Sequence, residues 1–196
     1  MVSPMGNVTT IAGTGNPGFQ DTESSFQNME QFSYPSDIVF WRDWENWDYR
    51  NPIDLDSFLV MNGKGRHVLF VADTGNHCIR KITGDIRYDP VQGEKTWENV
   101  NVTCFSGSAC GNVNEKSPRP GYADGERHEA RFDSPRGITV SSGGHIFVAD
   151  TNNHLVREID RFGTTKTIAG SLILAEVRHF LKKFFLFFQQ DRISKI

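Results

Sequence analysis

The stretch that decides the fold is written twice in this chain. The first copy reads Phe70-Val71-Ala72-Asp73-Thr74-Gly75-Asn76-His77-Cys78-Ile79-Arg80-Lys81-Ile82, and the second reads Phe147-Val148-Ala149-Asp150-Thr151-Asn152-Asn153-His154-Leu155-Val156-Arg157-Glu158-Ile159. Each copy has a short apolar run, a polar turn and a second run of branched and charged residues. Such runs, separated by Asn, Asp and Gly, are typical of two strands joined by a tight turn. The sequence therefore predicts a β-hairpin that recurs after 77 residues.

The repetition extends on both sides of this hairpin. A strand that begins with proline precedes each copy, at 35–40 and at 135–140, and proline is tolerated at the first residue of a strand. A further strand, which ends in a small residue and glycine, recurs at 8–13, 102–107 and 165–170. Four short strands per repeated unit indicate the blades of a β-propeller.

The tripeptide Asn153-His154-Leu155 lies within the second hairpin and resembles the NHL repeat, whose family is named for those three residues. The resemblance covers about residues 8–83 and 101–170. It implies an all-β fold, a partial β-propeller of four-stranded antiparallel blades. The first copy departs from the tripeptide with Cys78 in place of leucine, and both residue types are commonly buried.

Residues 1–170 are therefore expected to form one propeller segment, with blade one at about 35–107, blade two at about 135–170 and 8–13 as an outer strand. Residues 171–196 break the pattern. Their apolar residues keep helical spacing and predict an amphipathic helix with too many charges to span a bilayer. Two alternatives stay open for this tail. It contacts a membrane surface or a partner, or it is a segment foreign to the family. The spaced residues are Leu174, Val177, Leu181, Phe184 and Phe188.

Blade one carries two insertions that blade two lacks, from Trp41 to about Arg66 and from Gly84 to about Asn99. Strand parity places both on one face of the propeller, opposite the hairpin turns. The first insertion holds a cluster of aromatic residues, and Trp and Tyr are enriched among interface hot spots. Alternatively these rings cover a small core of the insertion itself. The candidate partner-binding residues are Trp41, Trp44, Trp47 and Tyr49.

Eight polar residues recur at equivalent places in the two hairpins. A catalytic residue is needed once per site, so recurrence favours an architectural role. The histidines are expected to fix the turns, the aspartates to accept N–H bonds from the turn that follows, and the arginines to bond between blades. The eight residues are Asp73, Asn76, His77, Arg80, Asp150, Asn153, His154 and Arg157.

The composition is that of an ordinary globular chain, with 37% hydrophobic and 23% charged residues. The net charge is −3, of which the part before Ser171 carries −6 and the tail +3. Some members of the resembled family bind RNA, but an acidic body repels phosphate, so nucleic-acid binding is not expected. The chain opens with no signal-peptide pattern. An extracellular location stays open if the chain is a fragment.

The three cysteines are sparse. Cys104 and Cys110 stand six residues apart across a Ser-Gly-Ser turn, close enough to form a disulfide if oxidised, which leaves Cys78 over. Further ligands at zinc spacing, a Ser-His-Asp order and a phosphate-binding glycine loop cannot be read from the sequence. We therefore expect no cofactor, no metal and no catalytic residues.

The sequence predicts a non-catalytic scaffold that binds a protein partner through the loops of a rigid propeller face. Two alternatives remain: part of a metal-dependent lyase or hydrolase, since proteins similar to this one include amidating lyases with metal in the axial channel, or an RNA-binding propeller. Two blades leave sheet faces open on both flanks. Hence we expect either a fragment of a longer protein or self-association through these unclosed edges.

Overall fold

The computed structural model of the chain describes residues 6, 8–22, 30–42, 66–89, 94–108, 110 and 118–170. The predicted tail helix at 171–196 lies outside these residues, as do Trp44, Trp47 and Tyr49.

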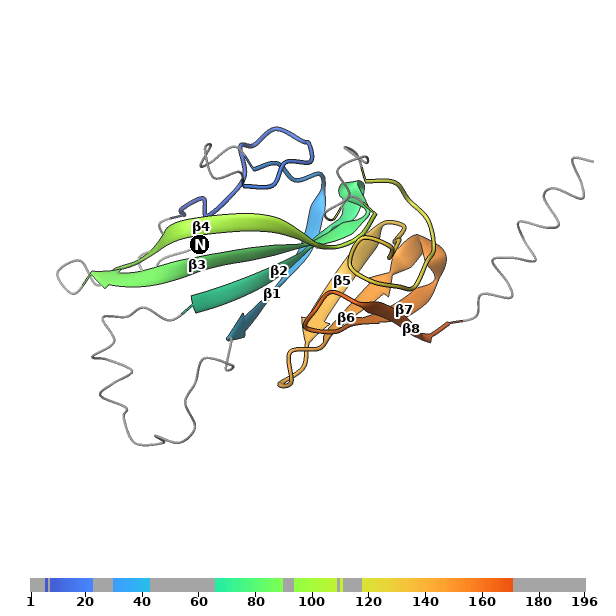
Figure 1. Cartoon of the computed structure of the whole chain (residues 1–196). Helices are drawn as coiled ribbons and strands as arrows, with labels where there is room; N and C mark the ends of the chain where they lie inside the picture. Colours follow the sequence, from blue (N-terminus) through green and yellow to red (C-terminus); the bar gives the residue numbers. More distant parts are fainter. Residues whose placement is uncertain are drawn as a thin grey trace, which may run out of the picture.

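The described residues form two four-stranded antiparallel sheets, each in simple sequential order (Figure 1). Blade one has β1 (Pro35–Arg42), β2 (Arg66–Asp73), β3 (Cys78–Asp89) and β4 (Glu94–Ser106). Blade two has β5 (Pro135–Val140), β6 (Ile146–Asp150), β7 (Leu155–Ile159) and β8 (Thr165–Ala169). The predicted all-β fold, a partial β-propeller of two four-stranded blades, is confirmed.

The repeated hairpin has the same construction in both blades. A single 3₁₀ turn joins its strands, η2 (Thr74–Asn76) in blade one and η3 (Thr151–Asn153) in blade two. The histidine after each turn has a left-handed backbone, with φ of 51° at His77 and 58° at His154. This conformation reverses the chain so that Asp73 pairs with Cys78 and Asp150 with Leu155.

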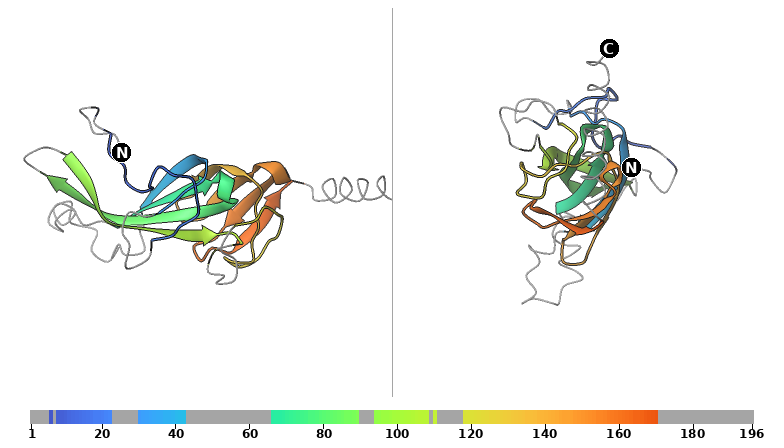
Figure 2. Two further views of the ribbon diagram at one scale, coloured as in Figure 1. Left: turned by 90° about the horizontal axis from the view of Figure 1, so that it is seen from above. Right: turned by 90° about the vertical axis from the view of Figure 1, so that its right-hand side faces the viewer.

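The second insertion of blade one lengthens a hairpin. β3 and β4 stay paired from Ile79 and Ser106 out to Asp89 and Glu94, with irregularities between Ile79 and Arg80 and between Thr83 and Asp85. The result is a two-stranded ribbon that projects well beyond β1 and β2 (Figure 2). In blade two the short turn between β7 and β8 takes its place.

Residues 9–13 form no strand in the structure, contrary to the expectation of an outer strand at 8–13. Val8 makes a β-bridge, and residues 9–11 line a pocket together with Thr96 and Trp97 of β4, but they do not continue as a ladder. Ile11 and Ala12 instead pack on the apolar face formed by Leu69, Val71, Ile82 and Val102.

The core lies between the blades. One face of blade one packs against one face of blade two, and the loop ahead of β5 contributes Ala130 and Phe132. Phe70 and Phe105 face each other there with ring centroids 4.9 Å apart. We name the packed face of blade one its trailing face (Val68, Phe70, Ala72, Ile79 and Phe105) and the packed face of blade two its leading face (Ile138, Ile146, Val148 and Ile159). The two sheets are thus bound side by side through apolar contact, as successive blades are.

Candidate interaction surface

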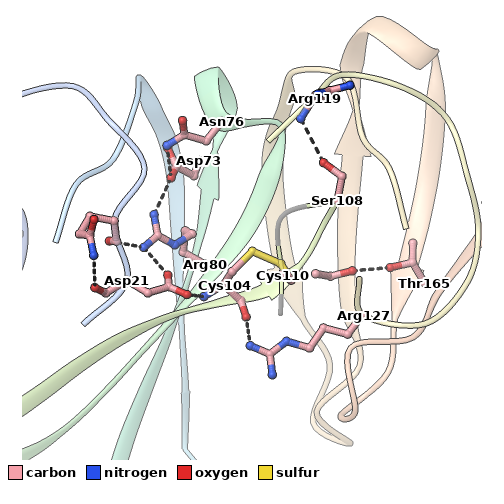
Figure 3. Close-up of a disulfide and its surroundings, with 12 residues drawn as sticks. Asp21, Asp73, Asn76, Arg80, Cys104, Ser108, Cys110, Arg119, Arg127 and Thr165 are labelled. Carbon is pink, nitrogen blue, oxygen red and sulfur yellow. Dashed lines mark hydrogen bonds and ion pairs between the residues drawn. A yellow bond between two sulfur atoms is a disulfide. The ribbon is translucent and has the colours of Figure 1, made fainter. Parts of the chain in front are cut away.

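The first signature network is centred on the buried guanidinium of Arg80 (Figure 3). Arg80 donates to Oδ2 of Asp73 at 3.1 Å and to Oδ1 of Asp21 at 2.7 Å. It also donates to the carbonyls of Gln31 and Gln20, at 2.9 and 2.8 Å. These bonds tie the loop ahead of β1 to the hairpin turn and to β3.

Aromatic rings and an amide complete this network. The Arg80 guanidinium lies over the rings of Phe19 and Phe32, 4.8 and 5.0 Å from their centroids. Asn76 donates to Asp73 and to the carbonyl of Gly18, each at 2.8 Å. The planar cation is therefore held at its edge by hydrogen bonds and on its faces by rings.

Blade two repeats the network. Arg157 donates to Asp150 and to Asp124, each at 2.7 Å, and lies over two rings, Tyr122 and Phe132. Further donors and acceptors match one for one: Arg157 to the carbonyls of Arg131 and Ala123, and Asn153 to Asp150 and to the carbonyl of Gly121. The arginine and the paired aspartate at the centre of each network are 0% exposed.

These contacts correct three details of the sequence interpretation. The arginines bond within their own repeat, because their side chains lie on the face covered by the preceding loop. Asp73 accepts the backbone N–H of Ser33, at 2.7 Å, from that loop, and the following turn contributes only the Asn76 side chain. The His77 ring does not fix its own turn, because its Nδ1 accepts the N–H of Ser134 from the next blade at 3.1 Å.

Burial governs the titration of the paired aspartates. Desolvation raises the pKa of Asp73, against hydrogen bonds from Asn76 and Ser33 and the charge and hydrogen bond of Arg80. The pKa of Asp150 is raised for the same reason, with Asn153, the Asp133 N–H and Arg157 opposing it. A buried carboxyl with every oxygen bonded internally stabilises a loop and is not exposed to a substrate.

The cysteines gather in one buried cluster on blade one. Cys104 and Cys110 form a disulfide (Figure 3). Cys78 is a free, buried thiol in the same cluster. Burial raises the pKa of the Cys78 thiol well above its usual value. The disulfide closes the start of the connection to blade two, and Arg127 of that connection donates to the carbonyl of Cys104.

Polar bonds at the top of the junction join the blades in register. The Thr74 hydroxyl lies 2.6 Å from the carbonyl of Pro135 and donates to it. The Asp37 carboxylate accepts the N–H of Ile138 at 2.9 Å, and His77 accepts that of Ser134 at 3.1 Å. Thr74 and His77 at the hairpin turn and Asp37 of β1 therefore bind the backbone around the start of β5.

Of the candidate partner-binding aromatics, only Trp41 lies within the described residues, and it faces inward. It is partly buried and packs on the core between the blades. A side chain at Gly144 in the turn of blade two would meet the Trp41 ring at 2.8 Å, so the ring also covers that turn. Trp41 therefore packs on the core shared by the two blades, which is neither of the two environments that the sequence offered for it.

Two sheet faces remain partly open. On blade two, Val156 and Ile168 lie on the trailing face, 40% and 49% exposed. On blade one, Ile38 and Phe40 lie on the leading face, 55% and 44% exposed. Tyr34 beside them is 81% exposed. These open flanks carry the exposed apolar side chains that a partner could cover.

Comparison with known families places a family model on the second repeat. The model described as "NHL repeat" matches residues 132–159, which run from Phe132 through β5, β6 and β7. This segment is an NHL repeat. The equivalent hairpin of blade one, which lies 77 residues earlier in the chain, has the same turn and the same Arg–Asp network.

Curated relatives carry the same resemblance over about half of the chain. NHL repeat-containing protein 2 of Homo sapiens is 33% identical over 103 residues, which are 52% of this chain and 11% of the relative. Protein SUPPRESSOR OF QUENCHING 1, chloroplastic, of Arabidopsis thaliana is 30% identical over 92 residues, 47% of this chain and 7% of that protein. The chain thus spans about a tenth of the length of these relatives.

Among solved structures, an auxiliary nutrient binding protein from Bacteroides thetaiotaomicron is similar with a TM-score of 0.37 and 18% identity, covering 53% of this chain and 23% of that one. In the described ranges, no helix has the length and apolar character needed to cross a membrane. Within those same ranges, no three His, Cys, Asp or Glu residues gather as metal ligands.

Each signature network contains one aspartate that the eight recurring residues predicted from the sequence did not include: Asp21 in blade one and Asp124 in blade two. Asp124 accepts Arg157 with Oδ1 and the backbone N–H of Thr167 with Oδ2, at 3.0 Å, and Asp21 does the same for Arg80 and Cys104. The signal was visible as the recurring Gly18-Phe19-Gln20-Asp21 and Gly121-Tyr122-Ala123-Asp124. Spacing alone did not reveal that a loop carboxylate bridges the third and fourth strands.

Proposed function

We propose that this chain is a non-catalytic segment of an NHL-repeat propeller, part of a longer protein, and serves as a scaffold that binds other proteins. The observation that carries the proposal is that the same buried Arg–Asp network occurs in both blades. Asp73 and Arg80 in blade one, and Asp150 and Arg157 in blade two, are 0% exposed and bonded within their own repeats. The polar signature is thereby committed to architecture.

Exposure of apolar side chains on the flanks supports a binding role. Val156, Ile168, Ile38 and Phe40 are each at least 40% exposed on sheet faces. Rigid sheets that present apolar residues, together with loops of variable length, are the usual means by which repeat proteins bind partners. The first insertion of blade one remains part of the proposal as a second contact region, on the strength of its aromatic sequence.

A loop exchange within the chain tests the proposal. Residues 43–65 are replaced by Ser-Ser-Gly-Gly, the sequence of the turn at 141–144 that joins the equivalent strands of blade two. A matched variant replaces 83–101 by the blade-two turn Asp160–Thr164. Each protein is immobilised, recovered partners are identified, and direct binding is measured with the purified partner.

We expect the intact chain to bind a protein in defined stoichiometry and the first exchange to weaken that binding more than the second. Equal binding by both exchanged proteins would remove the insertion from the proposal. An intact, folded chain that binds no protein in any purified, stoichiometric complex would overturn the scaffold function itself.

A further inference from the structure

The two blades bury equivalent residues to very different extents. On the trailing face of blade one, Ala72 and Ile79 are 0% exposed because blade two covers them. Their counterparts 77 residues later are Ala149, which is exposed, and Val156, which is 40% exposed. Blade two therefore presents, uncovered, a face whose copy in blade one is already an interface.

The polar residues of that interface are also present a second time. In blade one, the Thr74 hydroxyl and the His77 ring bond to the backbone of Pro135 and Ser134 across the junction. Their counterparts in blade two, Thr151 and His154, keep the same turn and the same left-handed histidine and are exposed. Blade two thus carries a hydroxyl and an imidazole at positions equivalent to Thr74 and His77, the two residues that join the blades.

The matching half of the interface is exposed at the other flank. Ser134, Pro135 and Ile138 form the part of blade two that Thr74, His77 and the apolar core contact, and Ile138 is 8% exposed. Their counterparts in blade one are Tyr34, Pro35 and Ile38, of which Tyr34 is 81% and Ile38 55% exposed. Tyr34 shares the left-handed backbone of Ser134, with φ of 49° and 52°.

We propose that the trailing face of blade two binds the leading face of blade one in a second copy of this chain, head to tail, with the blade junction as its template. The Thr151 hydroxyl donates to the Pro35 carbonyl of the next copy, and the His154 ring accepts the Tyr34 N–H. Val156 packs against Ile38. This inference deepens the proposed scaffold function and rests on it, because it names one partner and the residues that recognise it. It concerns the 196-residue chain by itself, since in a longer propeller the neighbouring blades would cover these two faces.

The contact is smaller than the internal junction, for two reasons. Ile11 and Ala12 already cover the outer part of the leading face of blade one, over Leu69, Val71, Ile82 and Val102. On blade two, the trailing face is polar near the start of β6 and the end of β7, since His145 and Glu158 pair there at 2.8 Å. A small contact predicts weak association that grows with protein concentration. A head-to-tail contact also adds further copies in rings or filaments.

Complementary surface variants test the arrangement. Ile38→Glu disables the leading face and leaves the trailing face intact, whereas Val156→Glu does the opposite. Both sites are at least 40% exposed, so the carboxylate does not enter the core. Sedimentation velocity over a range of concentrations measures the intact chain, each variant alone and an equimolar mixture. Phe162→Glu, at a residue that is 71% exposed in the turn after β7, is the matched control.

We expect the intact chain and the control to associate as concentration rises, and each variant alone to remain monomeric. The mixture must form a one-to-one dimer and no larger species, because only one functional pair of faces remains. His154→Asn, which keeps a residue tolerant of the left-handed backbone, provides a second variant and should lower the association constant about tenfold.

A monomeric intact chain at every concentration would overturn the inference and leave the scaffold proposal to its own binding test. Association of Ile38→Glu alone would also overturn it, since that result requires a contact that does not use the leading face of blade one. An intact chain that associates with itself but binds no other protein would instead contradict only the wider scaffold function.

Discussion

Asp21 and Arg80 lie 59 residues apart in sequence and meet at 2.7 Å. The same pair recurs in the second repeat as Asp124 and Arg157, also at 2.7 Å. In each case the second carboxylate oxygen accepts a backbone N–H of the fourth strand, from Cys104 or Thr167. One loop carboxylate therefore ties an outer strand to the centre of its blade, which makes it a test of how the blade edge is held.

Asp124→Ala is expected to loosen β8. The variant removes the acceptor for the Thr167 N–H and one partner of a buried guanidinium, and a lost hydrogen bond to a charged group costs about 1–3 kcal/mol. Amide hydrogen exchange should be faster at Thr167 while β6 keeps its protection. Arg136→Ala, at an exposed position on β5, is the control. Unchanged exchange at Thr167 would contradict the bridging role.

The junction predicts different effects for one substitution at two equivalent sites. Thr74→Val leaves the buried carbonyl of Pro135 without its donor and should lower the free energy of unfolding by about 1 kcal/mol. Thr151→Val changes an exposed residue and should alter it by less than about 0.5 kcal/mol. Urea unfolding at low protein concentration measures both. Equal losses would show that the cross-blade bond contributes nothing.

The sequence predicted the repeated strands because their pattern is local. Period-two apolar runs, a turn rich in Asn and Asp, and proline at the first strand position are each set by a few neighbouring residues. Both hairpins and both inner strands therefore form where predicted, from Pro35 and Pro135 onward. The second insertion was also placed correctly along the chain, but its pairing as a continued ribbon was not foreseen.

What the sequence could not supply were bonds between distant segments. His77 could be assigned to its own turn from spacing, yet its ring reaches Ser134, 57 residues away. Residues 8–13 match the fourth strand of each blade, but a strand forms only where a neighbour supplies a ladder. In this segment Val8 makes a β-bridge, residues 9–13 are outside any strand, and Ile11 packs on the apolar face of blade one. Trp41 packs on the core and lies against Gly144 of the other blade, a contact between segments that are distant in the sequence.

The shared core predicts that the two blades unfold together. Phe132 is 0% exposed in the cluster that both blades build, and Phe132→Ala should cost about 3–5 kcal/mol. All four tryptophans precede blade two in the chain. Their fluorescence should nevertheless report the loss of Phe132, with the same midpoint as circular dichroism. Phe162→Ala is the exposed control. A fluorescence midpoint that does not shift would show that the blades unfold independently.

Cys78 is expected to resist alkylation while the chain is folded. The thiol is 0% exposed, and burial raises its pKa well above the usual value, so the reactive thiolate is absent near neutral pH. Iodoacetamide at pH 8 should label the native protein at no cysteine, the protein unfolded in urea at Cys78 alone, and the protein unfolded and reduced at Cys78, Cys104 and Cys110. Mass spectrometry of the intact chain counts the added groups. Rapid labelling of Cys78 in the native chain would mean that the hairpin opens readily at the turn, and would contradict its buried place beside the disulfide.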